Sequence, residues 1–421
     1  MTDKKITVMT ISDHPLLPSG VATQTKYIIE ALLQSGKFKV ISLGGAVDHP
    51  SYETTAVEAY GNDWIIQPVK AYGTQQEIRR CLLQFKPDIL YFMTDPRFYD
   101  WLWHMEDEIR ENVPMIYYHV WDNYPYPVFN KSKYDSNDKV ATISKVTSDI
   151  VRTVSPTIDE QYIPHAVDTH IFKKKISSED REKISNIRQQ YKMDGKVVFF
   201  WNNRNARRKQ SGTLIFWFKE FLDRVGHDKA TLLMHTDLHD PHGQPLDYIA
   251  DDLGLTNGQI GFSVDKISAQ DLSLMYNLAD CTVNISDAEG FGLSTLESLS
   301  CETPIIVNMT GGLQEQVTDG ENYFGIGIEP ASKAVIGSQQ VPWIYEDRIT
   351  KEEFIDSLVK IYEMSPEERA QLGKAGRAHV EKNYNFSDFK DRWVQCMTDF
   401  HEKNGSWEER KNHQKWRFKT I

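Results

Sequence analysis

The sequence predicts an α/β protein with two doubly wound domains, and three observations support this fold class. Short apolar runs alternate with amphipathic segments along the chain, which is the pattern of a parallel sheet with helices on both faces. The pattern stops in a polar stretch near residues 168–195 and then starts again. A length of 421 residues is long for one hydrophobic core and suits two domains of ordinary size.

The first domain is predicted over residues 1–170. Apolar runs that end in turn residues predict strands, and apolar residues at helical spacing predict helices. Gly36 is expected to end the first helix. The expected strands are KKITVMTIS, FKVISLGG, PDILYFMT, VPMIYYHVW and KVATIS, and the expected helices are VATQTKYIIEALLQSG and EIRRCLLQFK.

The second domain is predicted over residues 196–385, followed by a C-terminal helix and basic tail over residues 386–421. The last stretch, SWEERKNHQKWRFKTI, is expected to be helical. Ligands of doubly wound domains bind at the carboxyl ends of the strands, so we expect a cleft shared by the two domains. The expected strands are KVVFFWNN, ATLLMHT, CTVNIS and PIIVNM, and the expected helices are GTLIFWFKEFLDRVG, LDYIADDLGL, QDLSLMYNLAD and STLESLSCE.

The composition disfavours several classes of protein. The net charge of −12 argues against a broad nucleic-acid surface, which needs a basic face. The four cysteines are far apart and form no C-x-x-C pair, so a reducing cytoplasm is expected. No apolar stretch has the length of a signal peptide core or a transmembrane helix. We therefore expect a cytoplasmic protein that is soluble or weakly peripheral.

The sharpest motif is SDAEGFGLSTLESLSCETPIIVNMTGGLQEQV, residues 286–317. A strand is expected to end near Ile285, and a helix to begin near Leu293 after a glycine-rich turn. Gly290 and Gly292 would let the backbone approach a ligand, and the free amides at the helix start would hold phosphate or sugar hydroxyls. A carboxylate such as that of Glu297 can accept two hydrogen bonds from a vicinal diol.

This motif closely resembles the signature of family 4 retaining glycosyltransferases, which share the GT-B fold. That signature has two glutamates around a Gly-Phe-Gly-Leu turn, then a small residue, Thr-Pro and a strand, Gly-Gly and a glutamate. The resemblance implies that Glu289 contacts the transferred sugar and that Glu297 binds the ribose. It also implies donor-binding roles for Gly290, Phe291, Gly292 and Leu293.

A second motif, FFWNNRNARRKQSGTLI, places Arg204 and Lys209 five residues apart after a strand. Cations at the carboxyl end of a strand can neutralise a departing pyrophosphate. The family has an arginine and a lysine at this spacing, so both are assigned to catalysis and to donor binding. One departure is that Gln210 and Ser211 follow the lysine, where the family has glycine.

Two further candidates lie in the first domain. Gly20 is expected near the amino end of a helix, where it would lie against the donor phosphates. His119 ends an apolar strand, and its resemblance to the His-Asp pair of the family implies a catalytic contact with the donor sugar; the corresponding aspartate, Asp122, comes three residues later. The segments YIPHAVDTHIF and HVEKNYNFSDFKDRW also resemble the family, whose last helices return to brace the first domain.

The expected reaction is the transfer of a sugar, with retention of configuration, from a UDP-, GDP- or ADP-sugar to an acceptor hydroxyl. No cofactor and no metal are expected, because the sequence contains no D-x-D and because Arg204, Lys209 and helix amino ends would replace a cation. The family implies front-face attack. A saccharide or glycoconjugate is the expected acceptor, with a small molecule as another option.

Three alternatives remain open at this stage. A phosphorylase or nucleotide-sugar epimerase of the same fold would show phosphate-dependent turnover, or a product without an acceptor. A glycosyltransferase that acts on a hydroxylated nucleic-acid base would bind DNA in a salt-sensitive way, although nucleic acid is not favoured. A non-catalytic protein that binds nucleotide sugars is disfavoured because every expected polar group is present.

Overall fold

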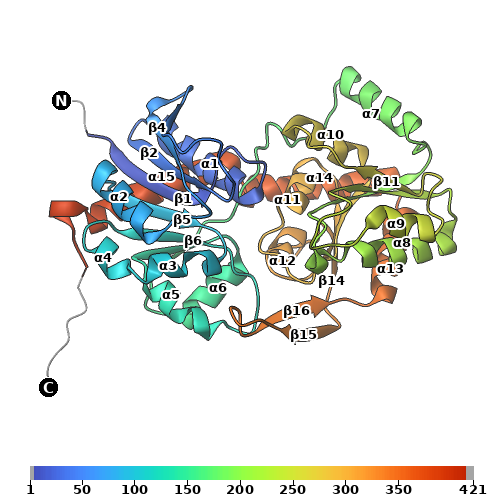
Figure 1. Cartoon of the computed structure of the whole chain (residues 1–421). Coiled ribbons are helices and arrows are strands. Elements are labelled where there is room, and N and C mark those ends of the chain that lie inside the picture. Colours follow the sequence, from blue (N-terminus) through green and yellow to red (C-terminus); the bar gives the residue numbers. More distant parts are fainter. Residues whose placement is uncertain (1–3, 414–421) are drawn as a thin grey trace. The chain divides into compact units, whose positions relative to one another are not determined.

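The computed structural model describes residues 4–413 and divides into two compact units (Figure 1). Unit 1 contains Met1–His165, Gln339–Pro342 and Ser387–Ile421. Unit 2 contains Ala166–Ser338 and Trp343–Phe386. Each unit has its own sheet, so the expectation of two doubly wound α/β domains is confirmed.

The sheet of unit 1 has eight strands in the order β3-β4-β2-β1-β5-β6-β7-β8. All neighbours pair in parallel except β3 and β4, which are antiparallel. The order runs outward in both directions from β1 and β5, as doubly wound topology requires. The strands are β1 Ile6–Asp13, β2 Phe38–Gly45, β3 Thr55–Val57, β4 Gly61–Pro68, β5 Ile89–Met93, β6 Met115–His119, β7 Lys139–Thr142 and β8 Glu160–Tyr162.

The helices of unit 1 connect these strands and include one from the end of the chain. Trp393 of α15 is fully buried, and its ring lies 5.7 Å from that of Tyr91 and 4.8 Å from that of Tyr118. This packing joins α15 to the core of the first sheet. The helices are α1 Gly20–Gln34, α2 Gln75–Phe85, α3 Asp100–Trp103, α4 Glu106–Arg110, α5 Lys131–Asp135, α6 Lys145–Val154 and α15 Phe386–Asn404.

The expected helix over SWEERKNHQKWRFKTI is wrong for its described part. Gly405 follows α15 with a φ of +57°, a left-handed conformation that ends a helix. Between this glycine and residue 413, the last that the structure describes, the chain forms a 3₁₀ turn at Trp407–Glu409. The remainder of the expected basic tail, residues 414–421, lies outside the described residues.

The sheet of unit 2 has six parallel strands in the order β11-β10-β9-β12-β13-β14. Its topological switch point lies between β9 and β12, where the strand order reverses direction. The strands are β9 Val197–Asn202, β10 Ala230–His235, β11 Ile260–Ser263, β12 Cys281–Asn284, β13 Ile305–Asn308 and β14 Gly325–Ile328. A separate antiparallel hairpin contains β15 Ser332–Ile336 and β16 Ile344–Arg348.

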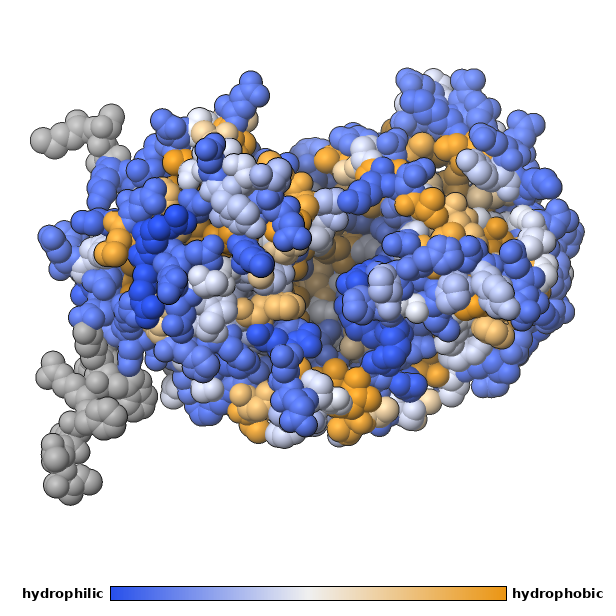
Figure 2. Space-filling view, in the orientation of Figure 1, coloured by the Kyte–Doolittle hydropathy of each residue, from blue (hydrophilic) through white to orange (hydrophobic). Residues whose placement is uncertain are grey.

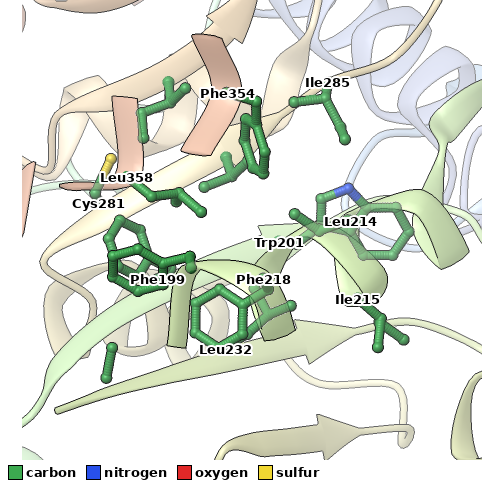
Figure 3. Packing of buried hydrophobic residues seen from close by; sticks show 14 of the residues in the cluster. Phe199, Trp201, Leu214, Ile215, Phe218, Leu232, Cys281, Ile285, Phe354 and Leu358 are labelled. Atoms are coloured by element: carbon green, nitrogen blue, oxygen red, sulfur yellow. The ribbon is translucent and has the colours of Figure 1, made fainter. Parts of the chain in front are cut away.

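The core of unit 2 lies where β9, β10 and β12 pack against α8 and α13 (Figure 3). Phe199 and Trp201 of β9 are fully buried, as are Phe218 of α8 and Phe354 of α13. A core of this size fixes the ends of the central strands, and those ends lead directly into the loops that follow. The helices are α7 Ser178–Gln190, α8 Ser211–Val225, α9 Leu246–Asp252, α10 Ala269–Leu278, α11 Leu293–Ser300, α12 Leu313–Val317, α13 Lys351–Glu363 and α14 Pro366–Asn383.

The face of the molecule in Figure 2 is mostly hydrophilic, with apolar residues in separate patches. No helix in residues 4–413 has the length and apolar character needed to cross a membrane. The four cysteines are unpaired thiols, and all are buried; they are Cys81, Cys281, Cys301 and Cys396.

Candidate active site

The candidate site lies at the switch point of unit 2, where the loops after β9 and β12 meet. The β9 loop carries the basic residues Arg204, Arg207, Arg208 and Lys209, and the β12 loop carries Asp287–Gly292. The two loops are joined by a backbone hydrogen bond of 2.8 Å from the amide of Asp287 to the carbonyl of Arg208. Arg208 also donates from Nη1 to the carbonyl of Ala288, at 2.6 Å. The switch point of such a sheet is where ligands bind.

Lys209 and Glu289 form a largely buried ion pair at this point. The Lys209 ammonium donates to Oε2 of Glu289, which also accepts from Nδ2 of Asn284 at 3.3 Å. Burial alone would raise the pKa of Glu289. The charges of Lys209 and Arg208, with the hydrogen bonds from Lys209 and Asn284, outweigh burial and lower that pKa. Glu289 is therefore an ionised acceptor at neutral pH, held in place by two donors.

The glycine turn between β12 and α11 has a fixed backbone. Gly292 has a φ of +90°, which a side chain would strain, and an added Cβ would lie 2.5 Å from Cδ2 of Leu313. Nε2 of Gln316 donates to the carbonyls of Phe291 at 2.7 Å and Gly292 at 3.2 Å. A trans peptide directs its N–H away from its carbonyl. Gln316 therefore orients the amides of Gly292 and Leu293 at the amino end of α11.

Glu297 lies on α11 and accepts a hydrogen bond from the hydroxyl of Tyr276 at 2.7 Å. The same hydroxyl accepts from Nδ2 of Asn202, the last residue of β9, at 2.9 Å. Burial raises the pKa of Glu297 to about 7, against the opposing effect of the Tyr276 hydrogen bond. This carboxyl consequently changes its charge near neutral pH.

Arg204 occupies a different position from Lys209. Its guanidinium forms a two-point ion pair with Asp240, with Nε 2.5 Å from Oδ2 and Nη2 3.1 Å from Oδ1. The side chain is 62% exposed. The sequence assigned both Arg204 and Lys209 to the pyrophosphate, whereas in the structure only Lys209 contacts Glu289. The pyrophosphate roles of both residues stay predictions.

Gln210 explains how the β9 loop tolerates the missing glycine. Its φ of +56° and ψ of 33° are left-handed, a conformation that glycine adopts freely and that costs another residue about 1–3 kcal/mol. Nε2 of Gln210 donates to Oδ2 of Asp287 at 2.6 Å. Gln210 thus adopts a backbone conformation that glycine adopts freely, and it adds a contact between the β9 and β12 loops.

The two candidates of unit 1 lie at the carboxyl edge of its sheet. Gly20 is the exposed first residue of α1, whose cap Ser19 accepts from the amide of Ala22 at 3.0 Å. His119 ends β6 and is fully buried, with Nε2 2.7 Å from the hydroxyl of Tyr134. Burial lowers its pKa to about 3, and Nδ1 has no hydrogen-bond partner among the residues that the structure describes. A contact of either residue with a donor stays a prediction.

The structure also places residues in the site that the sequence did not single out. Asn284 holds Glu289, Tyr276 holds Glu297, and Gln316 holds the glycine turn. Asn284 had a recognisable signal, because it is the last residue of an apolar strand next to the motif. Tyr276 gave none, since it comes from α10. Gln316 lies within the motif of residues 286–317, but no role was assigned to it there. Within residues 4–413, no group of three or more His, Cys, Asp and Glu side chains is arranged to hold a metal ion.

The structure is similar to solved structures over nearly its whole length. Sucrose-phosphate synthase from Thermosynechococcus elongatus gives a TM-score of 0.74 at 16% identity, covering 94% of this chain and 100% of that chain. Anabaena HepE in complex with UDP-glucose gives a TM-score of 0.70 at 15% identity, with coverage of 94% and 100%. The chain has the GT-B fold. At these identities the likeness establishes the fold alone.

Sequence comparisons match the GT-B chain over shorter segments. Residues 182–379 match the family described as glycosyl transferases group 1. A GDP-mannose-dependent monoacylated alpha-(1-6)-phosphatidylinositol monomannoside mannosyltransferase from Corynebacterium glutamicum is 32% identical over 111 residues, which is 26% of this chain and 23% of that protein. The matched segments span 15% and 23% of the first curated relatives. These matches support an enzyme of the glycosyltransferase class.

Proposed function

We propose that this GT-B protein is a retaining glycosyltransferase, which moves a sugar from a nucleoside diphosphate sugar to an acceptor hydroxyl without a metal ion. The observation that carries the proposal is the pair of Lys209 and Glu289 at the switch point, beside the glycine turn. A cation, an ionised acceptor and oriented amides are the groups that a sugar diphosphate needs. The group 1 match over residues 182–379 covers all of these groups.

Each donor group is assigned to a residue that suits its chemistry. The diphosphate is assigned to Lys209, Arg204 and the amides of Gly292 and Leu293. The hydroxyls of the transferred sugar are assigned to Glu289, which stays ionised because its pKa is lowered. The ribose diol is assigned to Glu297. Phe291 and Gly290 contribute backbone to the same turn. Gly20 keeps its assignment to the donor phosphates and His119 its assignment to the transferred sugar, and the acceptor is assigned to unit 1.

The proposed chemistry follows from these assignments. The bond from the anomeric carbon to the diphosphate oxygen breaks, and the acceptor oxygen bonds to the anomeric carbon on the same face. The departing phosphate oxygen takes the acceptor proton, so the products are a nucleoside diphosphate and a glycoside of retained configuration. Lys209 stabilises the negative charge that develops on the leaving group, as a preorganised cation does in a water-poor site. This cationic role is the basis for proposing metal independence.

The donor is proposed to be a UDP-, GDP- or ADP-sugar, and the acceptor a saccharide or glycoconjugate. Support for a nucleotide donor comes from the relatives. The mannosyltransferase is named as dependent on GDP-mannose, and HepE is described with UDP-glucose. No cofactor beyond the donor is part of the proposal.

The test combines binding with product analysis. Thermal shifts with UDP, GDP and ADP should identify the base, because a ligand that binds the native state raises Tm. The matching sugar donors are then incubated with saccharide acceptors, and the anomeric configuration of the product is read by NMR. A product of inverted configuration would disprove retention. Turnover that requires inorganic phosphate, or that needs no acceptor, would identify a phosphorylase or an epimerase instead.

A further inference from the structure

The hairpin of β15 and β16 lies outside the six-stranded sheet, yet its second strand bonds to the candidate active site. The amide of Asp347 donates to the carbonyl of Asp287 at 2.9 Å. Nδ2 of Asn308 donates to the carbonyl of Asp347 at 2.8 Å and to that of Ser286 at 2.9 Å. The hairpin therefore fixes the backbone just before Glu289 in two ways. The amide of Asp347 binds Asp287 directly, and the carbonyl of Asp347 is linked to Ser286 through Asn308.

The same strand places a buried carboxylate against the basic loop. The side chain of Glu346 is 2% exposed, and it accepts from both terminal nitrogens of Arg207, with Nη1 3.2 Å from Oε2. Nη2 of Arg348 donates to the same Oε2 at 2.7 Å. Burial opposes the ionisation of Glu346, but the hydrogen bonds and charges of the two arginines outweigh it and lower its pKa. The carboxylate is thus a fixed charge shared by two cations.

Arg207 is held at its backbone and at its guanidinium. It begins the 3₁₀ turn Arg207–Lys209, and its own amide donates to the carbonyl of His242 at 3.0 Å. Its side chain remains 61% exposed although Glu346 accepts from both Nη1 and Nη2. A guanidinium has five N–H donors, so the two that Glu346 engages leave others that can bind an anion.

We propose that Glu346 is a positioning residue that holds Arg207 as an additional ligand of the donor diphosphate, and that the hairpin braces the donor site. Glu346 fixes the guanidinium in advance, so the side chain loses little conformational freedom when an anion binds. The inference rests on the proposed function, because it adds a residue to the same donor site.

The test compares nucleoside diphosphate with nucleoside monophosphate, which lacks the second phosphate. Calorimetric titration of both ligands is carried out on the wild-type chain, Glu346→Gln, Glu346→Asp, Arg207→Ala and the double variant Arg207→Ala/Glu346→Gln. Arg224→Ala is the matched control, because Arg224 forms an exposed ion pair with Asp356 in the same unit, at 2.9 Å.

We expect Arg207→Ala to weaken diphosphate binding by roughly tenfold to a hundredfold, as the loss of a charge-assisted hydrogen bond does. Monophosphate affinity should change much less. Glu346→Gln should reproduce part of this selective loss, Glu346→Asp should recover it, and Arg224→Ala should behave as wild type. In the Arg207→Ala background, Glu346→Gln should add little, because its effect acts through Arg207.

Two results would overturn the inference. One is unchanged diphosphate affinity in Arg207→Ala, and the other is a full additional loss from Glu346→Gln in the Arg207→Ala background. If Glu346→Gln does not fold, Arg207→Ala still decides, because Glu346 keeps its partner Arg348 in that variant. A wild-type chain that binds no nucleotide would instead overturn the proposed function.

Discussion

Donor binding should depend on pH through Glu297, whose pKa burial raises to about 7. Only the ionised carboxylate can accept both hydrogen bonds of a ribose diol. The ionised fraction of a group with this pKa rises from about one-eleventh at pH 6 to about ten-elevenths at pH 8. Affinity for the donor should therefore increase about tenfold over this range.

The assay is calorimetric titration of the intact nucleotide sugar, because its diphosphate does not titrate between pH 6 and 8. In Glu297→Gln the dependence of donor affinity on pH should vanish. At pH 8 the binding free energy should become less favourable by about 1.5–3 kcal/mol, the usual value of a hydrogen bond to a charged group. Glu289 should not contribute to the dependence of affinity on pH in this range, because its pKa is lowered.

Asp287 provides the necessary control. Burial raises its pKa to about 6, so it also titrates in the range. Asp287→Asn should keep the pH dependence if Glu297 causes it. Affinity that stays flat from pH 6 to pH 8 in the wild-type chain, or a slope that survives in Glu297→Gln, would refute the reasoning.

The remaining predictions concern the leaving group, metals and the glycine turn. Lys209→Ala should lower kcat by roughly 10²–10³, the usual loss for one charge-stabilising donor, in steady-state kinetics; near-normal turnover would remove its role. Turnover should survive excess EDTA, and loss restored by Mg²⁺ would contradict the metal-free proposal. Gly292→Ala should lower stability by about 1–3 kcal/mol in denaturant titration, because of its positive φ and the contact with Leu313. An unchanged denaturation midpoint would show that the turn accommodates the added methyl group without loss of stability.

The sequence predicted the central strands because the apolar residues that are buried in each of them follow one another in the chain. The run that became β5 is apolar throughout, and those that became β9 and β13 are apolar up to their last residue; a parallel strand covered on both faces needs nothing more. The hairpin gave no such signal. Most residues of β15 are exposed, and the charge of the buried Glu346 of β16 is compensated by Arg348 and by Arg207, which is far away in sequence.

The candidate site shows the same difference between features that a local motif predicts and features that depend on the fold. Lys209 and Glu289 were each identified from a local motif, but their contact depends on β9 and β12 being neighbours in the sheet. The pairing of Arg204 with Asp240 could not be read from the motif, because Asp240 lies in the loop after β10. The local motifs therefore identified the candidate residues, and the order of the strands in the sheet determined which of these residues are in contact.

The buried cysteines make this chain convenient for site-specific labelling. Burial raises the pKa of the Cys301 and Cys396 thiols to about 12, and it raises those of Cys81 and Cys281 as well. Maleimide reagents attack thiolates, so native positions should react slowly. One cysteine introduced on the surface of each unit would then carry a pair of dyes against a low background. Energy transfer between them would report the distance between the two units as nucleotide is added.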